Sequence, residues 1–240
     1  MDETAFALLE RLEQDHWWFV GRREFIEAAF ARIRASRPWR VLDAGAGTGG
    51  NLPMLARHGA VSAFESDTAA AAIAQARGIG RVALGRLPDA IPFDTDRFEV
   101  IGAFDVIEHL DEPVAALRAL RSRLAPAAAI IVTVPAYPWL WGPHDEVHQH
   151  RRRYTRDTLR RDLEAAGLRV RYLTHLNLLL FPLAVLQRVR ESVFGYDAET
   201  LHVPRWLNRV LLRIWRLERR WVPTRSLPVG LSLLAIAEAE

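Results

Sequence analysis

Residues 41–50, VLDAGAGTGG, constrain this chain more than any other segment, because an apolar strand runs directly into closely spaced glycines. Glycines let the backbone turn sharply and approach a ligand with no Cβ in the way. A helix expected at residues 51–58 would direct its amino-terminal N–H groups at an anionic group. Glu65 follows about twenty residues on, at the end of the next apolar run, where a carboxylate can bind ribose hydroxyls. The segment predicts a ligand site at one edge of a parallel sheet.

Strand-like apolar runs alternate with helix-like stretches over most of the chain, which favours βαβ units and a parallel sheet. We expect an α/β fold with a Rossmann-like, doubly wound, mostly parallel sheet, an antiparallel last strand and a helical insertion. Residues 136–150, rich in Pro, Trp and His, predict a loop. Strands are expected at residues 41–42, 61–64, 82–84, 98–104, 130–134, 168–174 and 229–237. Helices are expected at residues 3–34, 51–58, 68–77, 113–124 and 155–166, with amphipathic stretches at 176–193 and 205–221.

The chain is expected to form one domain, residues 1–240, assembled from four parts. Residues 1–40 form a helical lid and residues 41–135 the core that binds the ligand. Residues 136–228 form the opposite side of the site together with the helical insertion, and residues 229–240 form the last strand.

Composition narrows the class of protein. Half of the 240 residues are hydrophobic, enough for one sizeable core, and the absence of cysteine excludes disulfides, thiolate metal sites and a cysteine nucleophile. The acidic N-terminus does not resemble a secretory signal, and no apolar run is long enough for a membrane span, so we expect a cytoplasmic protein. The net charge is only +3, but arginines gather in the last third of the chain. This asymmetry indicates an anionic partner there.

The glycine segment reads D-x-G-x-G-x-G, with Asp43 followed by Gly45, Gly47 and Gly49, and this spacing differs from G-x-G-x-x-G. It resembles class I S-adenosylmethionine-dependent methyltransferases. The resemblance continues through residues 98–113 and 124–137. Residues 148–168 are similar to the H-x-R-R-Y-T pattern of the branch that includes ubiquinone-biosynthesis-type O-methyltransferases, and both ends of the chain look like a bacterial subgroup.

The resemblance implies S-adenosyl-L-methionine as the cofactor and gives several residues a role. Glu65 would hold the ribose hydroxyls. Leu87 stands where many relatives have an aspartate, so adenine is expected to bind through apolar and backbone contacts. An arginine can pair bidentately with a carboxylate, which makes Arg22 a candidate for the methionine end. The residues expected along the methionine moiety and beside the cofactor are Asp43, Gly45, Ala46, Gly47, Phe104 and Asp105.

The acceptor side is expected to carry the acid–base chemistry. A hydroxyl acceptor must lose its proton, and histidine suits that role near neutral pH. His109 is the first candidate and His150 the second, although either could be a structural histidine. Asp105, Glu108 and His109 could instead bind a divalent cation, but ligand type alone favours no metal. The residues expected to contact the acceptor are Trp17, Trp18, His144, Arg152 and Tyr154.

Residues 205–221 place Leu207, Val210, Leu211, Ile214, Leu217 and Trp221 on one helical face, with arginines elsewhere. Basic residues and flanking tryptophans fit an interfacial helix, and packing on the core or in a homodimer is the ordinary alternative. The sequence therefore predicts methyl transfer, at oxygen, to a small-molecule or lipid-linked acceptor, with peripheral membrane contact through residues 205–221. A non-catalytic cofactor-binding protein and a nucleic-acid methyltransferase are alternatives. No nucleic-acid-binding module is recognisable, so no nucleic-acid partner is expected.

Overall fold

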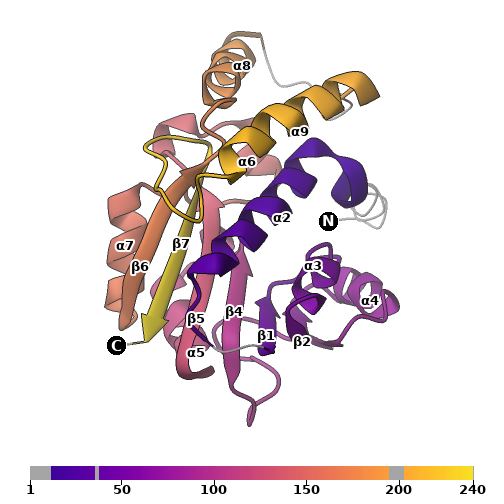
Figure 1. The fold of residues 1–240 in the computed structure, drawn as a ribbon, viewed down its shortest axis with the longest axis vertical. Coiled ribbons are helices and arrows are strands. Elements are labelled where there is room, and N and C mark those ends of the chain that lie inside the picture. The colour runs from indigo at the N-terminus through magenta and orange to yellow at the C-terminus, as the bar shows by residue number, and fades with distance from the viewer. Residues whose placement is uncertain (1–11, 36–37, 195–202, 240) are drawn as a thin grey trace.

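The computed structural model describes residues 12–35, 38–194 and 203–239. Its centre is a seven-stranded sheet of order β3-β2-β1-β4-β5-β7-β6 (Figure 1). The strands from β3 to β5 are parallel, while β7 runs antiparallel to both β5 and β6. The expected Rossmann-like fold with an antiparallel last strand is therefore confirmed. The strands are β1 (Trp39–Ala44), β2 (Gly59–Glu65), β3 (Arg81–Leu84), β4 (Phe98–Phe104), β5 (Leu124–Pro135), β6 (Leu168–Leu176) and β7 (Ser232–Ala239).

Helices cover both faces of the sheet because its central strands alternate apolar side chains between two cores. Leu42 and Ile130 face the core beneath α5 and α7, whereas Val41 and Ile131 face the core beneath α2, α3 and α9. The helices are α2 (Trp17–Ala29), α3 (Leu52–Ala56), α4 (Thr68–Ala76), α5 (Pro113–Arg121), α6 (Pro143–Val147), α7 (Arg156–Ala165), α8 (Phe181–Phe194) and α9 (Arg205–Arg219), with 3₁₀ turns η1 (Phe30–Arg32), η2 (Ile107–His109) and η3 (Pro138–Leu140).

Two expectations about local structure were wrong. The helix expected at residues 113–124 ends at Arg121, because β5 already begins at Leu124, six residues before the expected strand. Residues 136–150 are not a simple loop, since they contain η3 and α6. Both η3 and α6 begin with proline, whose missing N–H and fixed φ cost nothing at the first helical position.

Helix α9 packs along α2, side by side with it over the sheet (Figure 1). The buried Trp215 ring lies 5.3 Å from Phe25 and 5.1 Å from Trp18, between ring centroids, and it covers Gly21. At the start of α2, the Trp17 N–H donates to the Asn208 side chain at 2.7 Å. At the other end of the interface, Glu218 accepts bonds from two backbone N–H groups that precede α8.

This packing corrects the face expected for residues 205–221. Val210, Leu217 and Trp221, which we placed on the apolar face, are 40%, 58% and 39% exposed. Leu211 and Ile214 of the expected face do pack against the core, but the packed face is shifted around the helix toward the buried Trp215 and Glu218. It includes polar residues because Asn208 and Glu218 satisfy backbone groups of neighbouring segments, a role that hydrophobic periodicity does not reveal.

Substituting Gly21 tests this interface. Alanine inside a helix normally adds up to about 1 kcal/mol of stability over glycine. Here an added Cβ would lie 2.2 Å from Cε3 of Trp215, whose ring is held by neighbouring aromatic rings. We therefore expect Gly21→Ala to lower the free energy of unfolding in urea by about 1–3 kcal/mol, as overpacking does. Gly142→Ala is the control, because its Cβ would meet only the flexible end of Arg188. A Gly21→Ala variant as stable as the parent would contradict the packing.

Candidate active site

The carboxyl ends of β1, β2 and β4 bring the glycine segment and its expected partners to one edge of the sheet. The N–H groups of Gly45 and Ala46 donate to the carbonyl of Phe64 at 2.9 and 3.0 Å, which ties the loop to the end of β2. Gly45 has φ +77°, and a Cβ there would lie 2.7 Å from Val106. Gly47 has φ +55°, and a Cβ there would meet no atom within 4 Å. The loop backbone is thus fixed to the end of β2 at Gly45 and Ala46 and is open at Gly47, as close approach of a ligand requires.

Glu65 is part of the same loop structure. One carboxylate oxygen accepts the Gly47 N–H at 2.9 Å, and the other accepts the N–H groups of Ser66 and Asp67 at 2.7 and 2.9 Å. These bonds hold the half-buried carboxylate beside the open side of the glycine loop. Remaining lone pairs can accept hydroxyl groups of a ligand from that position.

Asp43 lies at the floor of the site. Its side chain is fully buried, and neither carboxylate oxygen has a hydrogen-bond partner within the described structure. Burial raises the pKa of Asp43 to about 7, although the nearby Arg22 lowers it and Glu65 and Glu13 add to the rise. An unsatisfied buried carboxyl group is costly, and it is suited to a ligand that brings a positive charge.

Arg22 comes from α2 and reaches down to the same edge. Its guanidinium forms an ion pair with Asp105, and Thr133 donates to the other oxygen of that carboxylate at 3.0 Å. Burial lowers the pKa of Arg22, while the charges of Glu108 and Asp43 act in the opposite direction. The Arg22 Nε–H has no partner within the described part of the chain, so one donor remains for a ligand.

Residues 12–15 close the other side of the glycine loop. Glu13 accepts the Thr48 hydroxyl at 2.6 Å and lies 3.1 Å from the Arg77 guanidinium. Glu13 and Thr133 carried no expectation from sequence. Their contacts join segments far apart in the chain, and no periodicity or motif marks them.

A histidine cluster follows β4. The rings of His109, in η2, and His150 lie 4.8 Å apart between centroids in an edge-to-face arrangement. His150 Nδ1 is 2.7 Å from Asp145 Oδ1, and His109 Nδ1 is 3.4 Å from the Gln149 carbonyl oxygen. The Arg151 N–H donates to the Glu108 carbonyl at 2.9 Å, which holds η2 and the segment that carries His150 together. Both candidate bases are therefore brought to one place.

Glu108 is buried beside these histidines. Its carboxylate oxygens have no hydrogen-bond partner within the described residues, and burial raises its pKa to about 8, with Arg22 and Arg153 opposing the rise. Glu108, His109 and His150 each offer one possible ligand atom, all within 4.8 Å of one another. The raised pKa favours a protonated, neutral Glu108 in this cluster near neutral pH.

The remaining expected residues lie in different surroundings. The rings of Trp17 and Trp18 meet edge to face, with 5.7 Å between their centroids, and both pack against Trp215. They therefore lie in the contact between α2 and α9. Leu87 and Phe104 are both buried, Leu87 in the core beneath α5 and α7 and Phe104 in the core beneath α2, α3 and α9. Arg152 donates to the carbonyls of Leu110 and Asp111. Tyr154 is buried within the core beneath α7, away from the surface, and the side chain of His144 lies outside the described residues.

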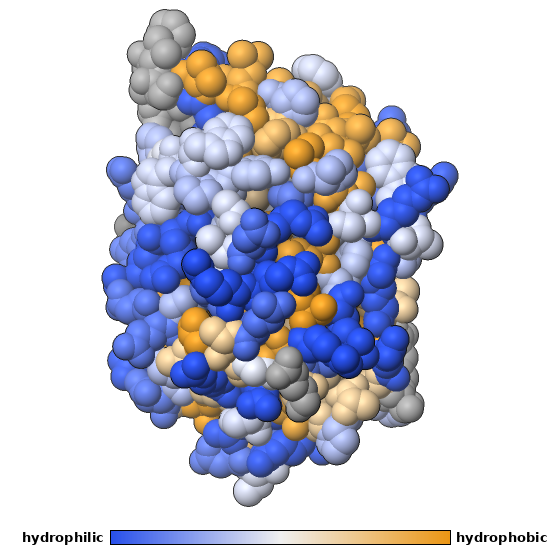
Figure 2. Space-filling view, turned by 90° about the vertical axis from the view of Figure 1, so that its left-hand side faces the viewer, coloured by the Kyte–Doolittle hydropathy of each residue, from blue (hydrophilic) through white to orange (hydrophobic). Residues whose placement is uncertain are grey.

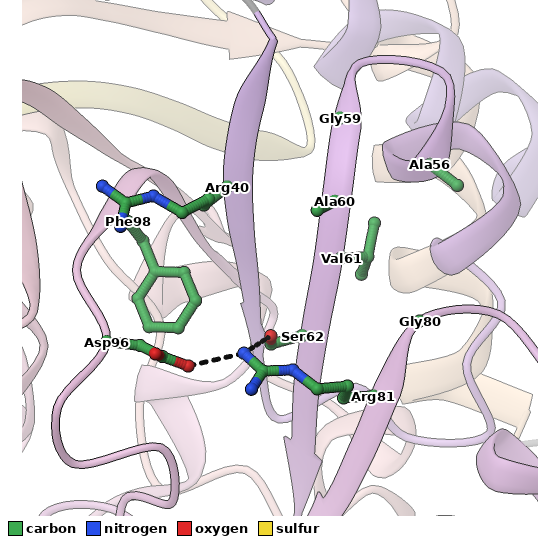
Figure 3. A pocket seen from close by; sticks show the side chains of 10 residues that line it. All are labelled: Arg40, Ala56, Gly59, Ala60, Val61, Ser62, Gly80, Arg81, Asp96 and Phe98. Carbon is green, nitrogen blue, oxygen red and sulfur yellow. Dashed lines mark hydrogen bonds and ion pairs between the residues drawn. The ribbon is translucent and has the colours of Figure 1, made fainter.

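One surface cavity, about 470 Å³, lies at the amino ends of β1 and β2, opposite the site (Figure 3). In it Arg81 bridges the Ser62 hydroxyl and Asp96. A second cavity, about 350 Å³, lies between α2 and α3 and is lined by Glu13, Gly50 and Arg77. The second cavity is next to the glycine loop, whereas the first is remote from every residue of the candidate site.

Comparison with known proteins gives a consistent result. A family model for a methyltransferase domain matches residues 17–173, and no curated protein sequence matches the chain. Magnesium protoporphyrin IX methyltransferase from Synechocystis PCC 6803, with bound SAH, has a TM-score of 0.62 at 13% identity, covering 99% of this chain and 95% of its own. A TehB-like SAM-dependent methyltransferase from Corynebacterium glutamicum has a TM-score of 0.55 at 18% identity, and the match covers 89% of this chain and 87% of that protein. The [4+2]-cyclase SpnF has a TM-score of 0.60 at 16% identity, and the match covers 95% of this chain and 84% of that protein. At these identities the likeness to solved structures shows the fold alone.

The buried Glu108 predicts a pH-dependent stability. Its pKa rises from about 4.5 in the unfolded chain to about 8 in the folded one, so its contribution is present in full below pH 4.5 and is lost as the pH rises through 8. Glu108→Gln stays neutral throughout. We therefore expect its free energy of unfolding, relative to the parent, to increase between pH 5 and pH 8 by about 1–3 kcal/mol. The exposed Glu112→Gln is the control, and a difference that does not grow with pH would contradict the burial.

Proposed function

This chain belongs to the methyltransferase domain family, and we propose that it methylates a hydroxyl oxygen of a small-molecule or lipid-linked acceptor. The enzyme is a methyltransferase and its cofactor is S-adenosyl-L-methionine. The observation that carries the choice of oxygen is the pair His109 and His150 beside the cofactor edge, one of them bonded to a buried carboxylate. A hydroxyl is the acceptor that most needs such a base.

The residues at the edge of the sheet fit the cofactor chemically. The unsatisfied carboxylate of Asp43 suits the ammonium group, which would favour the charged form of this residue. The unpartnered Nε–H of Arg22 suits the carboxylate. Glu65, fixed by three backbone N–H groups, suits the ribose hydroxyls. Leu87 offers an apolar wall for adenine, and Gly45, Ala46 and Gly47 allow close backbone approach.

The cofactor supplies an activated methyl group on a sulfonium centre. The chain's own residues then have two tasks, which are to hold the acceptor in line and to take its proton. Helix α2, whose Trp17 and Trp18 pack against Trp215 of α9, would cover the site. Asp105 and Thr133 hold Arg22 so that the lid is tied to the sheet. The histidine cluster supplies the proton acceptor on the side of β5.

Exposed apolar side chains on α8 and α9 support an apolar acceptor and a peripheral membrane contact. Trp206 on α9 is 67% exposed, and Leu183, Leu186 and Val189 expose one side of α8. Figure 2 shows hydrophobic surface gathered at the top of the molecule, where α8 lies in Figure 1. Exposed arginines lie along α9 and at its end, and they are Arg205, Arg209, Arg213, Arg216, Arg219 and Arg220. Two of them, Arg216 and Arg219, are paired with Glu24. No helix of the described residues is long and apolar enough to cross a membrane.

Removing Glu65 tests the cofactor assignment. We expect Glu65→Ala to weaken binding of S-adenosylhomocysteine by about 1–3 kcal/mol, because paired hydrogen bonds to the ribose are lost. Isothermal titration calorimetry measures the effect. Asp94→Ala is the matched control, since that carboxylate is exposed and pairs with Arg123 away from the glycine loop. Equal affinity for parent and Glu65→Ala would remove Glu65 from the cofactor site.

Charge reversal on α9 tests the membrane proposal. The parent should sediment with vesicles containing phosphatidylserine at low salt and should be released as salt rises, because each arginine contributes about 1 kcal/mol. Arg209→Glu with Arg213→Glu should reduce bound protein at least about tenfold. The control reverses Arg160 and Arg161, which are exposed on α7. If both double variants bind equally, or the parent ignores anionic vesicles, the acceptor is reached from solution instead.

A further inference from the structure

Asp145 is a buried acid at the centre of the loop between β5 and α7. Its side chain is fully buried, and three N–H donors converge on its carboxylate. They are the Gly142 N–H at 2.9 Å, the Arg153 Nε–H at 2.8 Å and the His150 Nδ1 at 2.7 Å. Burial alone would raise the pKa of Asp145, but the bonds from His150 and Arg153 outweigh it and hold that pKa well below its ordinary value. The group is therefore a fixed negative charge.

The charge determines which nitrogen of His150 carries a proton. A carboxylate accepts hydrogen bonds and cannot donate one, so His150 must donate from Nδ1. In the neutral ring, Nε2 is then the nitrogen with a lone pair. Arg153 also donates to the Ala136 carbonyl at 3.1 Å, just beyond β5, so the Asp145 carboxylate is anchored to the sheet. The His150 ring is thereby held by the core rather than by a free loop.

His109 lacks this support. Its Nδ1 faces a backbone carbonyl at 3.4 Å, which is longer than the carboxylate contact of His150 and carries no full charge. Burial lowers the pKa of His109, and the neighbouring His150 lowers it further. The Nδ1 of His150 thus has a carboxylate at 2.7 Å, whereas the Nδ1 of His109 has only a carbonyl at 3.4 Å, and a carboxylate favours positive charge on an adjacent ring more strongly.

We propose that Asp145 is a positioning residue that holds His150 with Nδ1 protonated, so that His150 Nε2, and not His109, takes the proton of the acceptor hydroxyl. The proposal rests on the function proposed above. In the step, the O–H bond breaks, its proton moves to Nε2, and its electron pair stays on the acceptor oxygen. That oxygen forms the new bond to the methyl carbon, whose bond to sulfur breaks with the pair going to sulfur. The imidazolium, paired with Asp145, later returns the proton to water.

Nitrogen NMR of the imidazoles tests the positioning without any turnover. With ¹⁵N-labelled histidine, the parent should show His150 as the Nδ1–H tautomer at neutral pH, with a low-field N–H proton. Asp145→Ala should abolish that tautomer preference and the low-field signal, while His109→Gln leaves both unchanged. An Nε2–H tautomer in the parent, or a His150 signal indifferent to Asp145, overturns the inference. The parent spectrum alone decides the tautomer if Asp145→Ala does not fold.

A kinetic arm separates this inference from the proposed function. With catechol as the hydroxyl probe, His150→Gln and Asp145→Asn should lower kcat at least about tenfold with an unchanged KM for the cofactor, and His109→Gln should change it less than about threefold. The reverse order of the two histidine variants overturns the assignment of the base. A parent that binds S-adenosylhomocysteine but leaves catechol unmethylated counts against the proposed hydroxyl acceptor, and the tautomer then decides the role of Asp145 by itself.

Discussion

The ion pair between Arg22 and Asp105 is the contact around which the rest of the site is arranged. It carries a guanidinium from α2 to the end of β4, into a region where the carboxyl groups of Asp43 and Glu108 are buried with no hydrogen-bond partner among the described residues. A buried charge is tolerated only when it is paired, so α2 must stay over the edge of the sheet. Trp215 of α9, packed on Gly21, holds α2 in that position. Helix α2, the carboxyl edge of the sheet and α9 are therefore joined by direct contacts.

The segment between β5 and α7, which we propose faces the acceptor, is fixed in a different way, by the hydrogen bonds of one buried acid. Asp145 gathers the segment from Gly142 to Arg153 and attaches it to the end of β5. The same segment reaches back to η2 through the Glu108 carbonyl. Two strands of the parallel sheet thus contribute opposite walls of one site, because their carboxyl ends meet at the same edge.

Sequence predicted that the glycine loop and Glu65 lie together, as the structure shows, for a physical reason. The glycine loop and Glu65 lie close together in the chain, and their roles depend on backbone conformation, which glycine spacing reveals. The face of α9 could not be predicted from hydrophobic periodicity, since Asn208 and Glu218 are used to satisfy distant backbone groups. The contact of Glu13 with Thr48 joins segments 35 residues apart, and no local pattern encodes it. Asp145 and His150 are only five residues apart, but they lie in an irregular segment where no periodicity indicates which side chains meet.

A crystal structure with S-adenosylhomocysteine is the most direct test that the carboxyl edge, enclosed by α2, is the site of methyl transfer. The account predicts ligand density along Gly45 to Gly47, with ribose hydroxyls on Glu65, the amino group beside Asp43 and the sulfur facing His109 and His150. Density in the cavity lined by Arg40 and Arg81, at the opposite edge of the sheet, would contradict it (Figure 3). So would a ligand on the glycine loop whose sulfur faces away from the histidine cluster.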